Sequence, residues 1–126
     1  MYIIPQVLRQ ILEENKVVVR NGAVMRDMLF VDDCIDAVLR LAVTPEAAND
    51  VFNIGSGEIV SISDIARGAI QVSKRSNVEY TDLEQNIDYS PTAIMADIGK
   101  VTETIDWRPR VSLSEGLKRM WDSYVN

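Results

Sequence analysis

Histidine is absent from the 126 residues of this chain, and cysteine occurs only once, at Cys34. A lone cysteine cannot form a disulfide within the chain. Without histidine, the usual metal clusters and the Ser/His and Cys/His nucleophile systems are excluded. Any chemistry that the chain supports must therefore use carboxylates, lysine, tyrosine or a bound partner. We expect Cys34 to be a small packing residue rather than a reactive thiol.

Clustered positive charge and long apolar runs are also missing. The net charge is −6 and the 13 basic residues are scattered, so electrostatic capture of nucleic acid is not expected. No apolar run approaches the roughly 20 residues of a membrane-spanning helix, and residues 1–10 lack the pattern of a secretory signal. We therefore expect a cytoplasmic protein without a nucleic-acid or membrane partner. The length and the 47% hydrophobic content predict one folded domain over residues 1–126.

Apolar spacing predicts five helices that alternate with short strands. Two helices begin at capping boxes, in which a serine is followed three residues later by an acidic residue. The helices are expected at 4–15, at 32–44 with Asp32 and Asp33 as amino-terminal caps, after Ser61 and Asp64, at 97–105, and after Ser112 and Glu115. The strands are expected at 17–19, 27–31, 51–54 and 78–81.

The predicted strand from Val51 to Ile54 is apolar on both faces except for Asn53, which is typical of a strand covered on both sides. Residues 82–92 have few apolar side chains and include Pro91, so a loop is expected there. The fold class is α/β (α+β), with about five helices around a few short strands.

Three motifs, in a fixed order and spacing, carry a family resemblance. They are Gly22-Ala23-Val24-Met25-Arg26-Asp27-Met28, then Phe30-Val31-Asp32-Asp33, then Val51-Phe52-Asn53-Ile54-Gly55-Ser56-Gly57. Together they resemble the extended short-chain dehydrogenase/reductase family, the NAD-dependent epimerases and dehydratases that act on nucleotide sugars. Asp97, Lys100 and Trp107-Arg108-Pro109 are similar to the carboxyl-terminal part of the family pattern.

The resemblance also implies that part of the enzyme is missing. Family members begin with a G-x-x-G-x-x-G turn that binds cofactor pyrophosphate, and they use a Tyr-x-x-x-Lys pair in catalysis; neither motif occurs here. We therefore expect a truncated, carboxyl-terminal substrate-binding domain without the amino-terminal Rossmann cofactor domain. NAD or NADP would bind the full-length enzyme, and the chain alone is expected to bind neither and to be inactive. The pair Gly55 and Gly57 is interpreted as a turn, because two glycines are weak evidence for a phosphate cradle.

Arg26 and Asn53 are the main candidates for substrate binding. The resemblance implies that Arg26 clamps the nucleotide diphosphate, since a guanidinium can donate two parallel hydrogen bonds to phosphate oxygens. The alternative is a surface ion pair with Asp27 or Asp32. Asn53 matches an asparagine near the substrate phosphates in relatives, and a buried amide needs a hydrogen-bond partner. Its alternative is a structural hydrogen bond to the 55–57 turn.

Further substrate contacts are implied on both sides of these two residues. Val17 and Val19 match a strand whose backbone lies against the nucleotide base in relatives, although core packing alone explains their side chains. Relatives carry R-x-x-D at 85–88; here Gln85 replaces the arginine and Asp88 is retained. Losing one charge-assisted hydrogen bond would forgo about 1.5 to 3 kcal/mol. Asp32, Asp33 and Asp36 are interpreted as charges at a helix amino terminus rather than as a metal site.

Two functions remain open from the sequence. The favoured one is the substrate-binding domain of an NAD(P)-dependent nucleotide-sugar epimerase, 4,6-dehydratase or 4-keto reductase. The rival is a non-catalytic binding or assembly module that retains the fold. The expected partners are a nucleotide sugar and either the missing cofactor domain or a second copy bound through exposed strand edges.

Overall fold

The computed structural model describes residues 2–84 and 92–125, and all structural statements below refer to them. The helices are α1 (Ile3–Glu14), α2 (Val31–Val43), α3 (Ile62–Ser73), α4 (Gly99–Ile105) and α5 (Leu113–Val125), with a 3-10 turn at Pro45–Ala47. The strands are β1 (Lys16–Arg20), β2 (Met25–Arg26), β3 (Val60–Ser61), β4 (Glu79–Leu83) and β5 (Ala93–Ile94). This mixed α/β arrangement of five helices and short strands confirms the predicted fold class.

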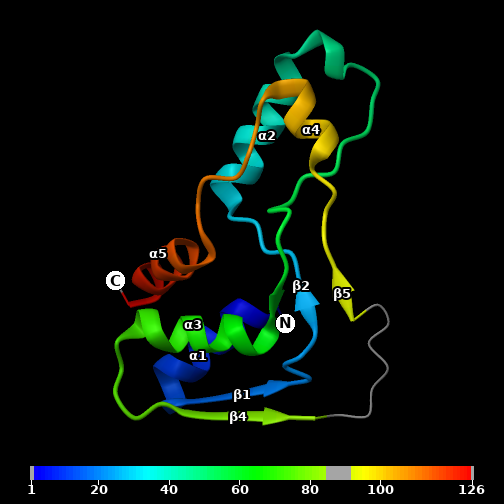
Figure 1. The fold of residues 1–126 in the computed structure, drawn as a ribbon. Helices are drawn as coiled ribbons and strands as arrows, with labels where there is room; N and C mark the ends of the chain where they lie inside the picture. The colour runs from blue at the N-terminus through cyan, green and yellow to red at the C-terminus, as the bar shows by residue number, and fades with distance from the viewer. Residues whose placement is uncertain (1, 85–91, 126) are drawn as a thin grey trace.

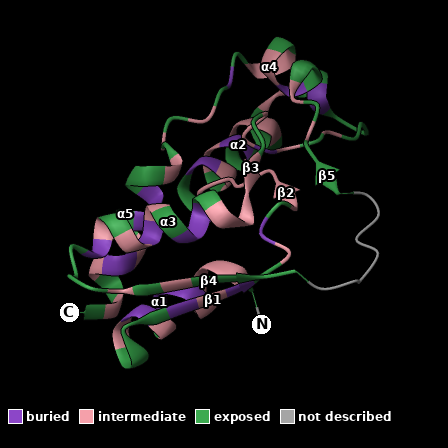
Figure 2. Cartoon of the chain, turned by 60° about the horizontal axis from the view of Figure 1, so that its bottom comes forward, coloured by how far each residue is buried: buried purple, intermediate pink, exposed green. Residues whose placement is uncertain are grey.

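Two bodies make up the molecule (Figure 1). The large body contains α1, α3, α5 and the parallel pair of β1 with β4. Apolar residues of α1 and α3 at helical spacing, such as Leu8 and Ile65, pack against Val17 and Val19, and all four side chains are almost fully buried. Figure 2 shows that α1, α3 and β1 each contain buried residues.

The small body contains α2 and α4. Its core consists of Ala37, Val101 and Trp107, with Phe52 and Ile54 packed against them. The three short strands, in the order β3-β2-β5, lie between the bodies, with β2 antiparallel to β3 and parallel to β5. The chain therefore passes between the two bodies four times, before α2, before α3, before α4 and before α5.

Predictions based on local spacing are confirmed. The first predicted helix differs from α1 by one residue at each end. Ser61 caps α3, because its Oγ accepts the backbone N–H of Asp64 at 3.0 Å and donates to the Asp64 carboxylate at 2.7 Å. The Oγ of Ser112 likewise accepts the backbone N–H of Glu115 at 3.2 Å. Local hydrogen bonds thus define the starts of both helices.

The prediction of a strand at 27–31 is wrong. The strand is β2, Met25–Arg26, because residues 25 and 26 are the ones that pair with β3 on one side and with β5 on the other. The helix α2 already begins at Val31, and its amino-terminal cap is Phe30, which makes no side-chain capping bond. Asp32 and Asp33 therefore lie in the first turn of α2 and are not its caps.

The strand predicted from Val51 to Ile54 is also wrong, because the described residues include no strand that pairs with it. Val51 is 82% exposed, whereas Phe52 and Ile54 pack into the small body. Lys100 of α4 holds the segment: its Nζ donates to the Val51 carbonyl at 2.9 Å and lies 4.7 Å from the centre of the Phe52 ring. Residues 51–54 therefore pair with no strand among the described residues.

Candidate functional site

Arg26 is the second residue of β2 and lies between Val60 of β3 and Ile94 of β5. Its Nη1 donates to the carbonyl of Met25 at 2.7 Å and, at the long distance of 3.5 Å, to the carbonyl of Thr92. Within the described part of the chain the guanidinium forms no ion pair and is partly exposed. Most of its five N–H groups are therefore available to a ligand.

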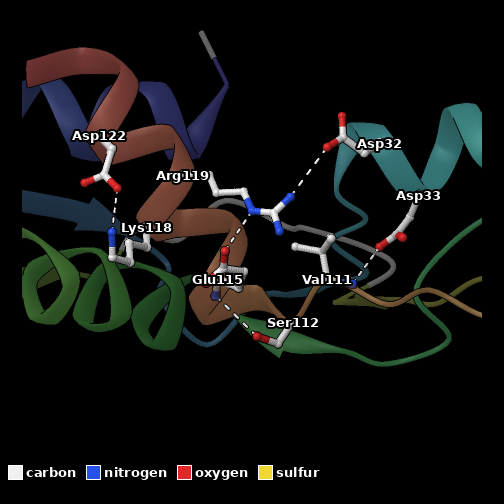
Figure 3. Close-up of polar contacts among 8 residues, drawn as sticks. All are labelled: Asp32, Asp33, Val111, Ser112, Glu115, Lys118, Arg119 and Asp122. Atoms are coloured by element: carbon white, nitrogen blue, oxygen red, sulfur yellow. Dashed lines mark hydrogen bonds and ion pairs between the residues drawn. The ribbon is translucent and has the colours of Figure 1, made fainter. Parts of the chain in front are cut away.

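The two carboxylates expected as alternative partners of Arg26 are engaged elsewhere. Asp27 accepts the backbone N–H of Ser56 at 2.7 Å and its Oγ–H at 2.6 Å. Asp32 forms an ion pair with Arg119 of α5, with an Nη1 to Oδ2 distance of 3.5 Å (Figure 3). Among the described residues, Arg26 therefore forms no ion pair with either Asp27 or Asp32.

The turn at Gly55–Gly57 surrounds the Asp27 carboxylate. Besides Ser56, the backbone N–H of Gly57 donates to Asp27 at 3.0 Å, and that of Ala96 donates at 3.1 Å. Partial burial alone would raise the pKa of Asp27, but the hydrogen bonds from Ser56, Ala96 and Gly57 more than offset it and lower that pKa below its ordinary value. The turn therefore does not fit a cofactor pyrophosphate, because its donors already bind an anion of the chain.

Asn53 is exposed, so the expectation of a buried amide is wrong. Its side chain makes no hydrogen bond to the described residues, and this includes the 55–57 turn that was the alternative partner. The amide lies two residues before Gly55, on the segment that Lys100 holds against α4. Its position leaves the amide open to a ligand.

The side chains of Val17 and Val19 lie in the core, 0% and 1% exposed. The backbone bonds from Asn21 to Leu83 and from Glu79 to Asn15, both 3.1 Å, set the phase of the parallel ladder. Because alternate residues of a parallel strand bond to the same neighbour, Val17 and Val19 bond toward β4. The backbone groups of Val18 therefore point to the free edge of β1. The sequence alone could not show this, because Val17, Val18 and Val19 are identical residues.

The free edge of β1 is partly occupied. The backbone N–H of Val18 donates to the side-chain oxygen of Gln10 in α1 at 2.9 Å. Gln10 was not predicted as a site residue, and nothing in its local sequence indicates the contact.

Gln85 and Asp88 lie outside the described residues. Among the described residues, a recess of about 500 Å³ is lined by residues that include Gly22, Asp82 and Thr92. Thr92 contributes to this recess and also supplies a carbonyl to Arg26. The Arg26 guanidinium therefore contacts a residue, Thr92, that lines the recess.

The acidic residues near the start of α2 are structural. Asp33 is buried and accepts the backbone N–H of Val111 at 2.9 Å, which joins α2 to the segment before α5 (Figure 3). Asp36 pairs with Arg40 at 3.0 Å. No group of three potential metal ligands occurs among the described residues. None of the described helices is long and apolar enough to cross a membrane.

Known proteins match the chain over most of its length. Residues 2–55 match the model of the NAD dependent epimerase/dehydratase family. The chain is 31% identical over 105 residues to CDP-paratose 2-epimerase of Salmonella typhi, which covers 81% of this chain and 30% of that protein. It is also 31% identical over 130 residues to GDP-L-fucose synthase 1 of Arabidopsis thaliana, covering 98% of this chain and 39% of that protein.

Solved structures agree with these relatives. UDP-glucuronic acid 4-epimerase from Bacillus cereus, in complex with UDP-glucuronic acid and NAD, superposes with a TM-score of 0.84 at 28% identity, over 99% of this chain and 40% of that one. The chain thus spans roughly a third of the length of the curated relatives described above. Its motifs, fold and relatives agree, and the chain belongs to the extended short-chain dehydrogenase/reductase family of NAD-dependent nucleotide-sugar epimerases and dehydratases.

Proposed function

We propose that this chain is the substrate-binding portion of an NAD(P)-dependent nucleotide-sugar epimerase or dehydratase, and that Arg26 binds the diphosphate of the substrate. The observation that supports the proposal most is the state of the guanidinium, which is partly exposed and has only carbonyl partners among the described residues. An arginine with both nearby carboxylates engaged elsewhere is suited to bind an anion from outside the chain.

The remaining proposed contacts follow from Arg26. The exposed Asn53 donates from its amide to a phosphate or sugar oxygen of the substrate. Backbone groups of Val18, at the free edge of β1, bind the nucleotide base. Asp88 provides a further contact to the substrate. Binding energy from the nucleotide would orient the sugar, so that remote contacts support chemistry elsewhere in the enzyme. A bound nicotinamide supplies hydride exchange in this class of enzyme. We assign its binding to the rest of the enzyme.

We further propose that the NAD(P)-binding portion covers the outer face of α2. This face carries five large apolar side chains that are at least half exposed: Val31, Ile35, Val38, Leu39 and Val43. An exposed apolar row on a helix that also has a buried side is typical of a surface that packs against another layer.

The same face favours a second candidate function. An assembly module that retains the fold would also use an apolar helix face to recruit a partner, and it would not need Arg26. Nucleotide binding therefore distinguishes the two functions, because only the first requires it.

The experiment is a calorimetric titration of the purified chain with UDP-, dTDP-, GDP- and CDP-linked sugars. We expect one nucleotide class to bind, and we expect Arg26→Ala to weaken it at least tenfold, because a charge-assisted hydrogen bond contributes about 1.5 to 3 kcal/mol. Arg108→Ala is the matched control, since Arg108 is exposed and makes no hydrogen bond or ion pair with described residues. If no nucleotide sugar binds at millimolar concentration, or if Arg26→Ala binds as wild type does, the assembly function is the better account.

A further inference from the structure

Three segments that are distant in sequence meet at the carboxylate of Asp27. They are the end of β2, the Gly55–Gly57 turn and the link from β5 to α4 at Ala96. Oδ1 accepts two hydrogen bonds from Ser56, and Oδ2 accepts one each from the backbone of Gly57 and Ala96. All four donors come from segments other than β2 and Asp27, which directly follows it.

The turn is shaped around this carboxylate. A Cβ on Gly55 would lie 2.7 Å from Asp27 Oδ2 and 2.4 Å from the Cβ of Ala96, so a side chain there would push the three segments apart. Gly57 has a φ of +73°, which side-chain-bearing residues rarely adopt. Gly55 is needed because the backbone closes on Asp27, and Gly57 because of its positive φ.

The two proposed phosphate contacts lie beside this junction. Arg26 directly precedes Asp27, and its strand is bonded to β5 on both sides, through Met25 to Thr92 at 2.8 Å and through Asp27 to Ile94 at 3.0 Å. Asn53 lies two residues before Gly55, where the turn begins. The Asp27 side chain is thus the bridge between the strand that carries Arg26 and the segment that carries Asn53.

We infer that Asp27 is a positioning residue that holds Arg26 and Asn53 in register for one diphosphate; this inference rests on the proposed function. A carboxylate is required because all four hydrogen bonds are donated to it. In Asp27→Asn the amide NH₂ replaces one acceptor oxygen and faces donors, either the N–H and O–H of Ser56 or the backbone N–H groups of Gly57 and Ala96. In Asp27→Ala all four donors lose their acceptor.

The test compares four chains, wild type, Asp27→Asn, Asp27→Ala and Asp33→Asn, by calorimetric titration with UDP, dTDP, GDP and CDP. Each is titrated at a temperature where circular dichroism shows that it is folded. Asp33→Asn is the matched control, because Asp33 is a buried carboxylate that accepts a backbone N–H, that of Val111, at a different junction. We expect both Asp27 variants to bind at least tenfold more weakly than wild type, and Asp33→Asn to keep wild-type affinity.

A rescue measurement separates positioning from general destabilisation. Formate is small enough to occupy the space left in Asp27→Ala and to accept its free donors. We expect formate, but not sodium chloride of equal ionic strength, to restore nucleotide binding to Asp27→Ala, with no gain for wild type.

The outcomes are distinct. Wild-type affinity in Asp27→Asn alongside a loss in Arg26→Ala would overturn the role of Asp27 and leave the proposed function standing. Equal losses in Asp27→Asn and Asp33→Asn, or no rescue by formate, would show that Asp27 is only structural. If wild type binds none of the four nucleotides, the proposed function fails and the role of Asp27 fails with it.

Discussion

The large and small bodies differ in how much of their apolar surface the chain itself covers. In the described residues the core of the large body has ten buried side chains, whereas that of the small body has three. The helix α2 of the small body also leaves Leu39 62% exposed and Val43 81% exposed. The core of the large body is therefore the more extensive of the two, while the small body leaves apolar side chains of α2 that the described residues do not cover.

Substitutions that create a cavity in either core should lower the free energy of unfolding the most. The part of the chain that loses protection should differ between the two cores. Leu8→Ala in the large body should lower the free energy of unfolding by about 2–5 kcal/mol, and Trp107→Ala in the small body by about 3–5 kcal/mol. Leu8→Ala should reduce amide hydrogen-exchange protection throughout the chain, whereas Trp107→Ala should reduce it mainly in α2 and α4. Equal loss of protection in α1 and α3 of Trp107→Ala would mean that the bodies unfold as one unit.

An intermediate effect is expected on self-association. If the outer face of α2 is uncovered in the isolated chain, sedimentation should show concentration-dependent association. Leu39→Asp should suppress it, because a charge on that face opposes apolar contact. Leu83→Asp is the matched control: Leu83 is 41% exposed on β4 and tests association through strand edges. Suppression by Leu83→Asp alone would assign the contact to the strands.

The smallest effect is expected for the pH dependence of stability that Asp27 causes at the junction of the bodies. The pKa of Asp27 is lowered from 3.8 in the folded state, so its stabilisation is fully present above that value and is lost as pH falls through the folded pKa. Urea unfolding of wild type should therefore show a loss of stability below about pH 4, and Asp27→Asn should show a shallower loss. A steeper loss in Asp27→Asn would contradict the assigned hydrogen bonds.

Local patterns predicted the elements whose stabilising contacts are local. The helix spacing in α1 and the serine caps Ser61 and Ser112 involve residues at most four positions apart, and the structure confirms them. The strand errors at 27–31 and 51–54 have one cause. A strand exists only where another strand supplies hydrogen bonds, and the sequence does not indicate which segments meet.

The candidate site likewise contains some residues that a local motif indicates and others that depend on contacts between distant segments. Arg26 is a candidate because a motif surrounds it, but the phase of β1 and the exposure of Asn53 depend on tertiary contacts. Asp27 was weighed only as a partner of its neighbour Arg26, whereas its actual partners are 29 to 69 residues away. A contact at that separation leaves no periodic pattern in the sequence.

The four passages of the chain between the bodies have a topological consequence. The small body is made of two separate insertions, one carrying α2 and the other carrying α4, and each begins and ends in the large body. No single truncation can remove the small body or release it intact. A protease cut between α2 and Val51 would leave two fragments, each with one end held in the large body, so the nicked molecule should migrate as one particle until it is denatured.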